Sequence, residues 1–449
     1  MRKTLIQAVL FACIGGVVPG TTVTAQISPP PRAPAEWTLD AVITAALTQQ
    51  PLIDAAKARL TAAEGGRQTA SVLPNPVATY WVENARFPGG ASSTALDRES
   101  SVYATLPLEP FLQRRSRIAQ AGHEIRAAQA SVTTAEQAVA REAIHAFYRV
   151  ALAQASLDAV RDNLTAIDQL VVYLRNRVAQ GAAPEGELIR AEVERDRVDT
   201  DATLADVELL RAQAALRPFL GGADATGRLR VVAPDWARER VALGPVTEFT
   251  AYALAHRAEL AASRATADAR ASALNLERSL VVRQLGASFG FKQTAGVNTT
   301  MVVGISLTVP LFDRNRGEIQ RATSEHLAAT MESQWLERTI TSEVEAEYQA
   351  AERLAARITV LQPSFLSRAA ESRRIALGAY QEGATGLLQV LDASRALSDA
   401  RLTYARIVAA ANESLFDLGI AAGYDARSAA RLGRGAPGPV ATRPDGGSR

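Results

Sequence analysis

Two short stretches in the second half of the chain alternate between apolar residues and small or polar ones. Residues 285–291 read Leu-Gly-Ala-Ser-Phe-Gly-Phe, and residues 301–309 read Met-Val-Val-Gly-Ile-Ser-Leu-Thr-Val. Successive side chains of a β-strand point to opposite sides, so this alternation predicts two strands that each have one apolar side. A turn near Gly296-Val297-Asn298 would join them into a hairpin.

A second hairpin is predicted in the first half of the chain. Residues 77–87 and 99–106 alternate more weakly around a Pro88-Gly89-Gly90 turn. Strands of about ten residues with one apolar side suit a transmembrane barrel. Two soluble hairpins that pack on helices are the alternative. Four strands cannot close a barrel, and lipid tolerates no open sheet edge, so the membrane interpretation requires several copies. Two chains would supply eight strands and three would supply twelve.

Each hairpin is followed by a very long helical pattern. Residues 112–180 contain no proline and a single glycine, Gly122, and their apolar residues recur at steps of three and four. This spacing is typical of a coiled-coil seam. At 1.5 Å per residue, one helix over this range would be roughly 100 Å long. Residues 317–380 repeat the pattern, with Pro363 expected to kink or interrupt the helix. On the helical pattern alone, a soluble coiled-coil stalk is the alternative.

The two halves of the chain resemble each other. Residues 46–56 match residues 253–262, Leu106-Pro107-Leu108 matches Val309-Pro310-Leu311, and residues 181–191 match residues 383–393. The offset between matching positions changes only from 207 to 203 to 202. Three ordered matches at nearly constant spacing indicate a duplication. The predicted unit is a helix, a hairpin, a very long helix, a tight turn and a returning helix.

Composition limits the possible functions. The 449 residues are 47% hydrophobic but only 5% aromatic, and alanine is abundant, which favours a mainly α protein with a small β part. The net charge of +2 argues against nucleic-acid binding. The single cysteine, Cys13, cannot form an intramolecular disulfide or a thiolate zinc site.

The ends of the chain carry signals of their own. Residues 1–25 combine Arg2 and Lys3 with an apolar stretch and the small residues Val23-Thr24-Ala25, which predicts a cleaved signal peptide. We interpret Cys13 as a small apolar residue of this peptide, with lipidation as the alternative. Residues 26–236 would form the first repeat and residues 237–423 the second. The glycine-, proline- and arginine-rich residues 424–449 are expected to be a disordered tail.

The sequence predicts no enzyme, no cofactor and no bound metal. Gly286-Ala287-Ser288-Phe289-Gly290 fits the esterase pattern G-x-S-x-G, but this serine lies within an alternating strand rather than at a strand-to-helix turn. No phosphate-binding loop or dinucleotide fingerprint is found. The histidines are scattered without metal-ligand spacing. They are His123, His145, His256 and His326.

From about Trp37 to Gly423 the sequence resembles the outer-membrane efflux protein family typified by TolC. Three segments resemble the branch that serves cobalt/zinc/cadmium-type cation efflux. They are Leu73-Pro74-Asn75-Pro76, Val82-Glu83-Asn84 and residues 309–319, which read Val-Pro-Leu-Phe-Asp-Arg-Asn-Arg-Gly-Glu-Ile.

The resemblance implies a homotrimer in the outer membrane of a Gram-negative bacterium. Each chain would give four strands to a twelve-stranded β-barrel in the outer-membrane lipid, continued by a twelve-helix α-barrel across the periplasm. The resemblance also implies partners: a periplasmic adaptor protein and an inner-membrane transporter of the RND type. The duct would passively carry metal cations or small toxic compounds. A soluble periplasmic coiled-coil scaffold and a duct for type I protein secretion are the alternatives.

The resemblance further places function in two turns and one aperture. The turns Gly181-Ala182-Ala183-Pro184 and Gly383-Ala384-Thr385-Gly386 would contact the adaptor, and their glycines supply the freedom that chain reversal needs. Asp392 matches an aspartate that lines the closed aperture, where three copies would form an acidic ring. The other aperture aspartate corresponds to Gln389. Glu187 matches an acidic residue that bridges neighbouring helices, but its arginine partner is replaced by Thr385.

Overall fold

The computed structural model describes residues 36–84, 98–221, 229–232, 243–281, 285–294, 298–361 and 364–432. The expected signal peptide with Cys13, the turn at residues 88–90, Gly296, Val297, Pro363 and residues 433–449 lie outside these ranges. Residues Ala35–Arg449 form one compact unit, to which all of the following refers.

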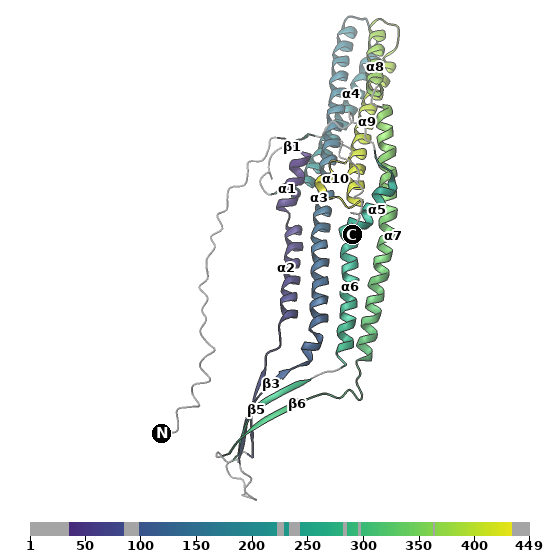
Figure 1. The fold of residues 1–449 in the computed structure, drawn as a ribbon. Helices are drawn as coiled ribbons and strands as arrows, with labels where there is room; N and C mark the ends of the chain where they lie inside the picture. The colour runs from purple at the N-terminus through teal and green to yellow at the C-terminus, as the bar shows by residue number, and fades with distance from the viewer. Residues whose placement is uncertain are drawn as a thin grey trace. The chain divides into compact units, whose positions relative to one another are not determined.

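The described residues are mostly helical (Figure 1). The helices are α1 (Leu39–Gln49), α2 (Pro51–Ser71), α3 (Glu109–Ala179), α4 (Glu185–Leu216), a 3-10 turn η1 (Arg217–Phe219), α5 (Val246–His256), α6 (Ala258–Ser279), α7 (Arg316–Leu361), α8 (Phe365–Gln381), α9 (Leu387–Ala421) and α10 (Ala426–Ala429). The strands are β1 (Trp37–Thr38), β2 (Val77–Glu83), β3 (Glu99–Pro107), β4 (Val231–Val232), β5 (Gly286–Thr294) and β6 (Asn298–Ser306).

The long helices agree closely with the sequence pattern. Helix α3 is a single helix of 71 residues over the range where one long helix was predicted. Its counterpart in the second half consists of α7, which ends at Leu361, and α8, which begins at Phe365. The predicted interruption near residue 363 is therefore confirmed as a break between two helices.

The two predicted hairpins join in one antiparallel sheet with the order β2-β3-β5-β6. The two halves meet where β3 pairs with β5, for example Val102 opposite Phe291. Strand β6 ends at Ser306, opposite Gly286 at the start of β5, whereas the alternation predicted a strand to Val309. The reason is that residues 307–309 extend past the beginning of β5, and no strand among the described residues lies beside them.

The sheet has one apolar side and one side that carries most of its polar residues. The apolar side carries aromatic and aliphatic side chains that are largely exposed in the single chain. The opposite side carries small and polar residues together with Val77, Trp81, Tyr103 and Val302. On this side the hydroxyl of Ser288 lies 2.8 Å from that of Thr105. Lys292 on this side pairs with Glu99 and, at 4.0 Å, with Glu83. The apolar side is formed by Ala78, Tyr80, Val82, Val102, Ala104, Leu106, Ala287, Phe289, Phe291, Met301, Val303 and Ile305.

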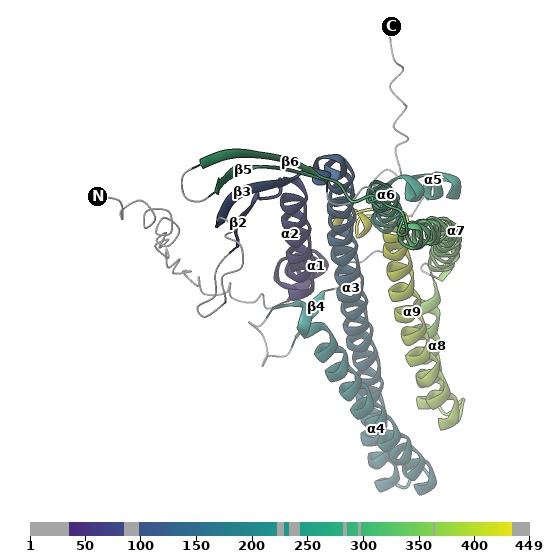
Figure 2. The ribbon, with the colours of Figure 1, turned by 90° about the horizontal axis from the view of Figure 1, so that it is seen from below.

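The duplication is visible in the element boundaries. Helix α5 spans residues 246–256, which are the bounds of α1 plus 207, and α6 begins 207 residues after α2. The repeats do not form separate domains, because α3 of the first half packs against α6 and α9 of the second half. Figure 2 shows α3 between α2 and α6.

Two features were not predicted. A two-stranded parallel sheet pairs Trp37 with Val231 and Thr38 with Val232. Residues 424–432, assigned to a disordered tail from the sequence, are folded: Asp425 accepts hydrogen bonds from the backbone amides of Arg427 and Ser428 and so caps α10. Leu432 is buried in the core beside α5, α6, α7 and α9. The apolar residues that follow the cap therefore belong to the core.

Among the residues that the structure describes, no helix combines the length and hydrophobicity that crossing a membrane requires.

Candidate functional site

The turn between α3 and α4 reverses the chain through a left-handed glycine. Gly181 has φ of +70° and lies just after the helix. Its amide donates to the carbonyl of Val178 at 2.9 Å, and the amide of Ala182 donates to that of Arg177 at 2.8 Å. This pair of bonds is the Schellman motif, which satisfies the last carbonyls of a helix. Ala183 and Pro184 then lead into α4, whose first turn begins after Pro184.

The turn between α8 and α9 repeats this geometry. Gly383 has φ of +77°, and its amide donates to the carbonyl of Tyr380 at 3.1 Å. The amide of Ala384 donates to the carbonyl of Ala379 at 2.8 Å. Thr385 follows, and Gly386 is the N-cap of α9. The two predicted tip turns thus have the same backbone conformation, and Figure 1 shows them at the same end of the helices, away from the sheet.

A tyrosine joins the two hairpins behind these turns. The hydroxyl of Tyr380 in α8 donates to Oε2 of Glu187 in α4 at 2.6 Å. The ring of Tyr380 is buried and meets that of Tyr173 edge-on, with centroids 6.4 Å apart. Burial makes the larger contribution and the hydrogen bond to Glu187 the next, and both raise the pKa of Tyr380 above its ordinary value. Glu187 therefore has a bridging partner within the chain, although Thr385 replaces the arginine that the family resemblance implies.

A buried glutamate forms a second link, between α4 and α9. The side chain of Glu194 is 6% exposed and accepts hydrogen bonds from Arg395 Nε at 2.9 Å and from Arg197 Nε at 3.1 Å. Burial by itself would raise the pKa of Glu194, but these two guanidinium groups lower it to about 2. Sequence analysis missed this residue. The spacing of Glu194 and Arg197 indicates a surface ion pair, and nothing local reveals the arginine from α9.

Asp392 lies close to this second link. Its side chain is 60% exposed, and its Oδ1 lies 3.7 Å from Nη1 of Arg395. Asp392 lines an open groove of about 720 Å³ between α8 and α9, together with Thr385 and Gln389. The structure thus brings these three predicted residues together. It also adds a feature that the sequence did not indicate, because the Asp392 carboxylate has a cationic neighbour.

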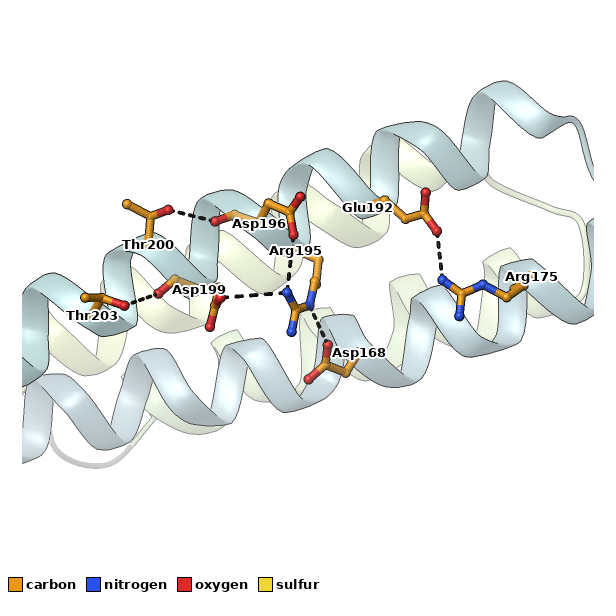
Figure 3. A network of polar contacts seen from close by, with 8 residues as sticks. All are labelled: Asp168, Arg175, Glu192, Arg195, Asp196, Asp199, Thr200 and Thr203. Carbon is orange, nitrogen blue, oxygen red and sulfur yellow. Dashed lines mark hydrogen bonds and ion pairs between the residues drawn. The ribbon is translucent and has the colours of Figure 1, made fainter.

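The outer faces of α3 and α4 are joined by exposed ion pairs (Figure 3). Arg195 of α4 donates through Nε to Asp168 of α3 at 3.0 Å, and Arg175 of α3 donates to Glu192 of α4 at 2.9 Å. All four side chains are at least one-third exposed. Exposed pairs of this kind contribute about 0–1 kcal/mol each, so they align the two helices more than they stabilise them.

A third polar cluster joins α3, α7 and α9 near the middle of the long helices. His145 Nε2 lies 3.0 Å from Asp417, and Arg141 lies 3.3 Å from the same carboxylate. The hydrogen bond to Asp417 raises the pKa of His145. Burial raises the pKa of the neighbouring Glu413 and Glu347. The cluster therefore holds three groups, His145, Glu347 and Glu413, whose pKa values lie above their ordinary values.

The described residues contain no group of three or more histidine, cysteine, aspartate or glutamate side chains that could hold a metal ion. His123 lies 3.5 Å from Asp268, and His326 contacts the carbonyl of Ala267 at 3.2 Å. Ser288 of the esterase-like pattern lies within β5, as the alternation predicted.

The comparisons with known proteins decide the family. Residues 42–222 and 251–423 match the profile of the outer membrane efflux protein family. The chain belongs to this family. Membership confirms the predicted resemblance, the outer-membrane location in a Gram-negative bacterium and the expectation that the chain is an efflux channel protein rather than an enzyme. It decides against the soluble periplasmic scaffold.

This chain is 27% identical over 384 residues to the cobalt-zinc-cadmium resistance protein CzcC of Cupriavidus metallidurans. The alignment covers 84% of this chain and 87% of that protein. This supports the predicted similarity to the cobalt/zinc/cadmium branch.

Solved structures show the same fold. The outer membrane protein VceC of Vibrio cholerae superposes with a TM-score of 0.71 at 20% identity over 86% of this chain and 96% of that one. CusC gives 0.71 at 17% identity over 87% and 93%, respectively. The outer membrane channel MtrE of Neisseria gonorrhoeae gives 0.70 at 18% identity over 86% and 89%.

Proposed function

We propose that this protein is the outer-membrane exit duct of a tripartite efflux system of the RND type. Three copies would close a twelve-stranded barrel in the outer membrane and continue it as a twelve-helix barrel in the periplasm. The single observation that carries the proposal is the sheet with one exposed apolar side, joined to long helices that end in two matching turns. Lipid would cover the apolar side, and the polar side would face water.

The cargo is proposed from the similarity to CzcC, which is named for resistance to cobalt, zinc and cadmium. The duct would pass metal cations or small toxic compounds without binding them tightly. A passive duct selects weakly, so the inner-membrane pump would choose the substrate.

The two tip turns are the proposed contact with the periplasmic adaptor. Gly181 to Pro184 and Gly383 to Gly386 have matching backbones, so one adaptor element could dock similarly on both. Space is open around Gly181 and Gly383, because a Cβ atom built on either would meet no other atom within 4 Å. An adaptor side chain could therefore approach these turns closely.

Asp392 is the proposed aperture residue. Three copies around the channel axis would place three carboxylates in one ring and favour cations. Because Arg395 lies 3.7 Å from each carboxylate, the ring would carry less effective negative charge than three isolated aspartates. We therefore expect a modest cation preference.

Planar-bilayer recording tests the proposal. The purified protein is expected to form channels, and Asp392→Asn is expected to lower the cation preference without loss of the oligomer. Glu382→Gln, a change of an exposed carboxylate at the end of α8, is the matched control. Absence of channels from correctly extracted protein would reject the duct. Equal selectivity of wild type and Asp392→Asn would reject the ring.

A further inference from the structure

Each hairpin of the sheet leads into its long helix through a junction segment, residues 111–117 in the first half and residues 311–316 in the second. Both junction segments begin with exposed apolar residues. Phe111 and Leu112 are 45% and 61% exposed, Leu311 is 68% exposed and Phe312 is fully exposed. Figure 1 shows the sheet at the end of α3 and α7 that lies opposite the tip turns. Exposed apolar residues that gather in one region indicate a surface that binds another molecule or a membrane.

Two exposed arginines follow the apolar residues of each junction segment. They are Arg114 and Arg115 in the first half and Arg314 and Arg316 in the second. Arg114 donates through Nε to the carbonyl of Ser71 at 3.3 Å, but within the described part of the chain none of the four arginines forms an ion pair. Their positive charge is therefore available to an anion from outside the chain.

Helix geometry places the apolar and basic residues of the first junction segment on one face of α3. Residues three and four apart are neighbours on a helix, so Phe111 lies beside Arg114 and Arg115, and Leu112 lies beside Arg115. Gln113 belongs to the opposite, buried face and is only 8% exposed. The exposed face of α3 is thus apolar where the helix begins and basic one turn later.

A buried asparagine holds the second junction segment in place. Asn315 is 3% exposed, and its side-chain amide donates to the backbone carbonyl of Glu277 at 2.8 Å and to Oε2 of Glu277 at 2.9 Å. The backbone amide of Asn315 donates to Oδ1 of Asp313 at 2.9 Å. Arg314 and Arg316 on either side stay exposed. Because this backbone is fixed, the two guanidinium groups are presented without the entropy cost of ordering a free loop.

Arg117 adds a third guanidinium group to the first junction segment. Its Nε and Nη2 atoms are buried, and neither has a hydrogen-bond partner among the residues that the structure describes. These two atoms form an edge of the guanidinium group that can bind a phosphate through two parallel hydrogen bonds. Arg117 is three residues from Arg114 and therefore lies beside it. A phosphate at Arg114 would supply the acceptor after a rotation of the Arg117 side chain.

We propose that the junction segments bind the phosphate headgroups of anionic phospholipids in the outer-membrane leaflet that faces the periplasm. This inference rests on the proposed duct, in which lipid covers the apolar side of the sheet. Acyl chains would extend from that side over Phe111, Leu112, Leu311 and Phe312. The arginines follow toward the periplasmic helices, so the order of apolar and basic residues matches the order of acyl chain and phosphate in a lipid. Each arginine near the headgroups is expected to strengthen binding about fivefold.

Native mass spectrometry of the assembled protein tests this lipid preference. The probes are dioleoyl phosphatidylglycerol, which is anionic, and dioleoyl phosphatidylcholine, which is zwitterionic. At low salt the wild type is expected to bind the anionic lipid at least about tenfold more tightly, and the preference is expected to shrink as salt is added. A variant without the junction arginines is expected to keep a preference of less than about threefold. It combines Arg114→Gln, Arg115→Gln, Arg314→Gln and Arg316→Gln.

The matched control removes four exposed arginines from other parts of α4 and α7 and is expected to keep the full preference. It combines Arg190→Gln, Arg338→Gln, Arg353→Gln and Arg357→Gln. Lysine at the four junction positions retains the charge and is expected to preserve at least about half of the preference.

Three results would overturn the inference: equal affinity of the wild type for both lipids, an equal loss of preference in the control, or full displacement of the lipid by equimolar glycerol 1-phosphate. Loss of the oligomer in both the glutamine and the lysine variant would assign the junction segments to a contact between copies and would also overturn it. Normal channels of the wild type in phosphatidylcholine bilayers would leave the duct intact in each case. Absence of channels would reject the duct itself.

Discussion

Removal of the charge on Glu194 is expected to loosen the helices next to the tip turns. The fall of its pKa from 4.5 to about 2 corresponds to about 3 kcal/mol of favourable interaction. Arg395 and Arg197 are 43% and 49% exposed, so screening by water reduces the useful part to about 1–2 kcal/mol. Glu194→Gln keeps the shape of the side chain and removes this contribution.

Hydrogen–deuterium exchange measures the effect locally. In Glu194→Gln, amides of α4 and α9 around residues 190–200 and 390–400 are expected to exchange about 5–30 times faster, as a loss of 1–2 kcal/mol implies. The matched control is Glu192→Gln, which removes an exposed pair from the same helix and is expected to change exchange less than about threefold.

The same interaction predicts a pH dependence of defined sign. Because the folded pKa of Glu194 is lowered, its stabilisation is complete above pH 4.5 and is lost as the pH falls toward about 2. After correction for intrinsic exchange, protection in the wild type is expected to decrease across this window, and protection in Glu194→Gln is expected to change less. Equal protection of wild type and variant, or an equal effect of Glu192→Gln, would refute the reasoning.

Three further results are expected. Tyr380→Phe removes the hydroxyl that joins the two hairpins, a hydrogen bond to a charged group that is worth about 1.5–3 kcal/mol, and is expected to raise single-channel conductance. Unchanged conductance together with unchanged amide hydrogen exchange at the tip turns would contradict this. Gly290→Ala is expected to prevent assembly because its Cβ would lie 2.2 Å from a carbonyl of β3, whereas Gly304→Ala, with its nearest atom at 3.8 Å, is expected to assemble normally on gels. The pKa of His145 is raised, so its charged bond to Asp417 stabilises the fold fully below pH 6.5 and is lost as the pH rises through the raised pKa. His145→Gln is therefore expected to reduce this pH-dependent loss of thermal stability. An unchanged profile of thermal stability against pH would count against this.

Much of the fold followed from local periodicity. Helix α3, the break between α7 and α8, and the alternation in β5 and β6 depend on residues a few positions apart, so the sequence revealed them directly. The glycines of the tip turns were also predictable, because a left-handed residue after a helix is best occupied by glycine. The duplication could be predicted as well, because matching residues recur in both halves at nearly constant spacing.

The polar links between the hairpins could not be predicted in this way. Glu187 and Tyr380 are 193 residues apart, and Glu194 and Arg395 are 201 residues apart. The sequence pattern of each helix shows which residues are charged, but not which of them another helix will bury.

The sequence by itself therefore determined the kinds of element, their order and their repetition, because helices and strands obey short-range spacing. Only the tertiary structure decided where β6 stops, which carboxylate is buried and how α10 folds back onto the core. Those outcomes depend on neighbours supplied by distant parts of the chain.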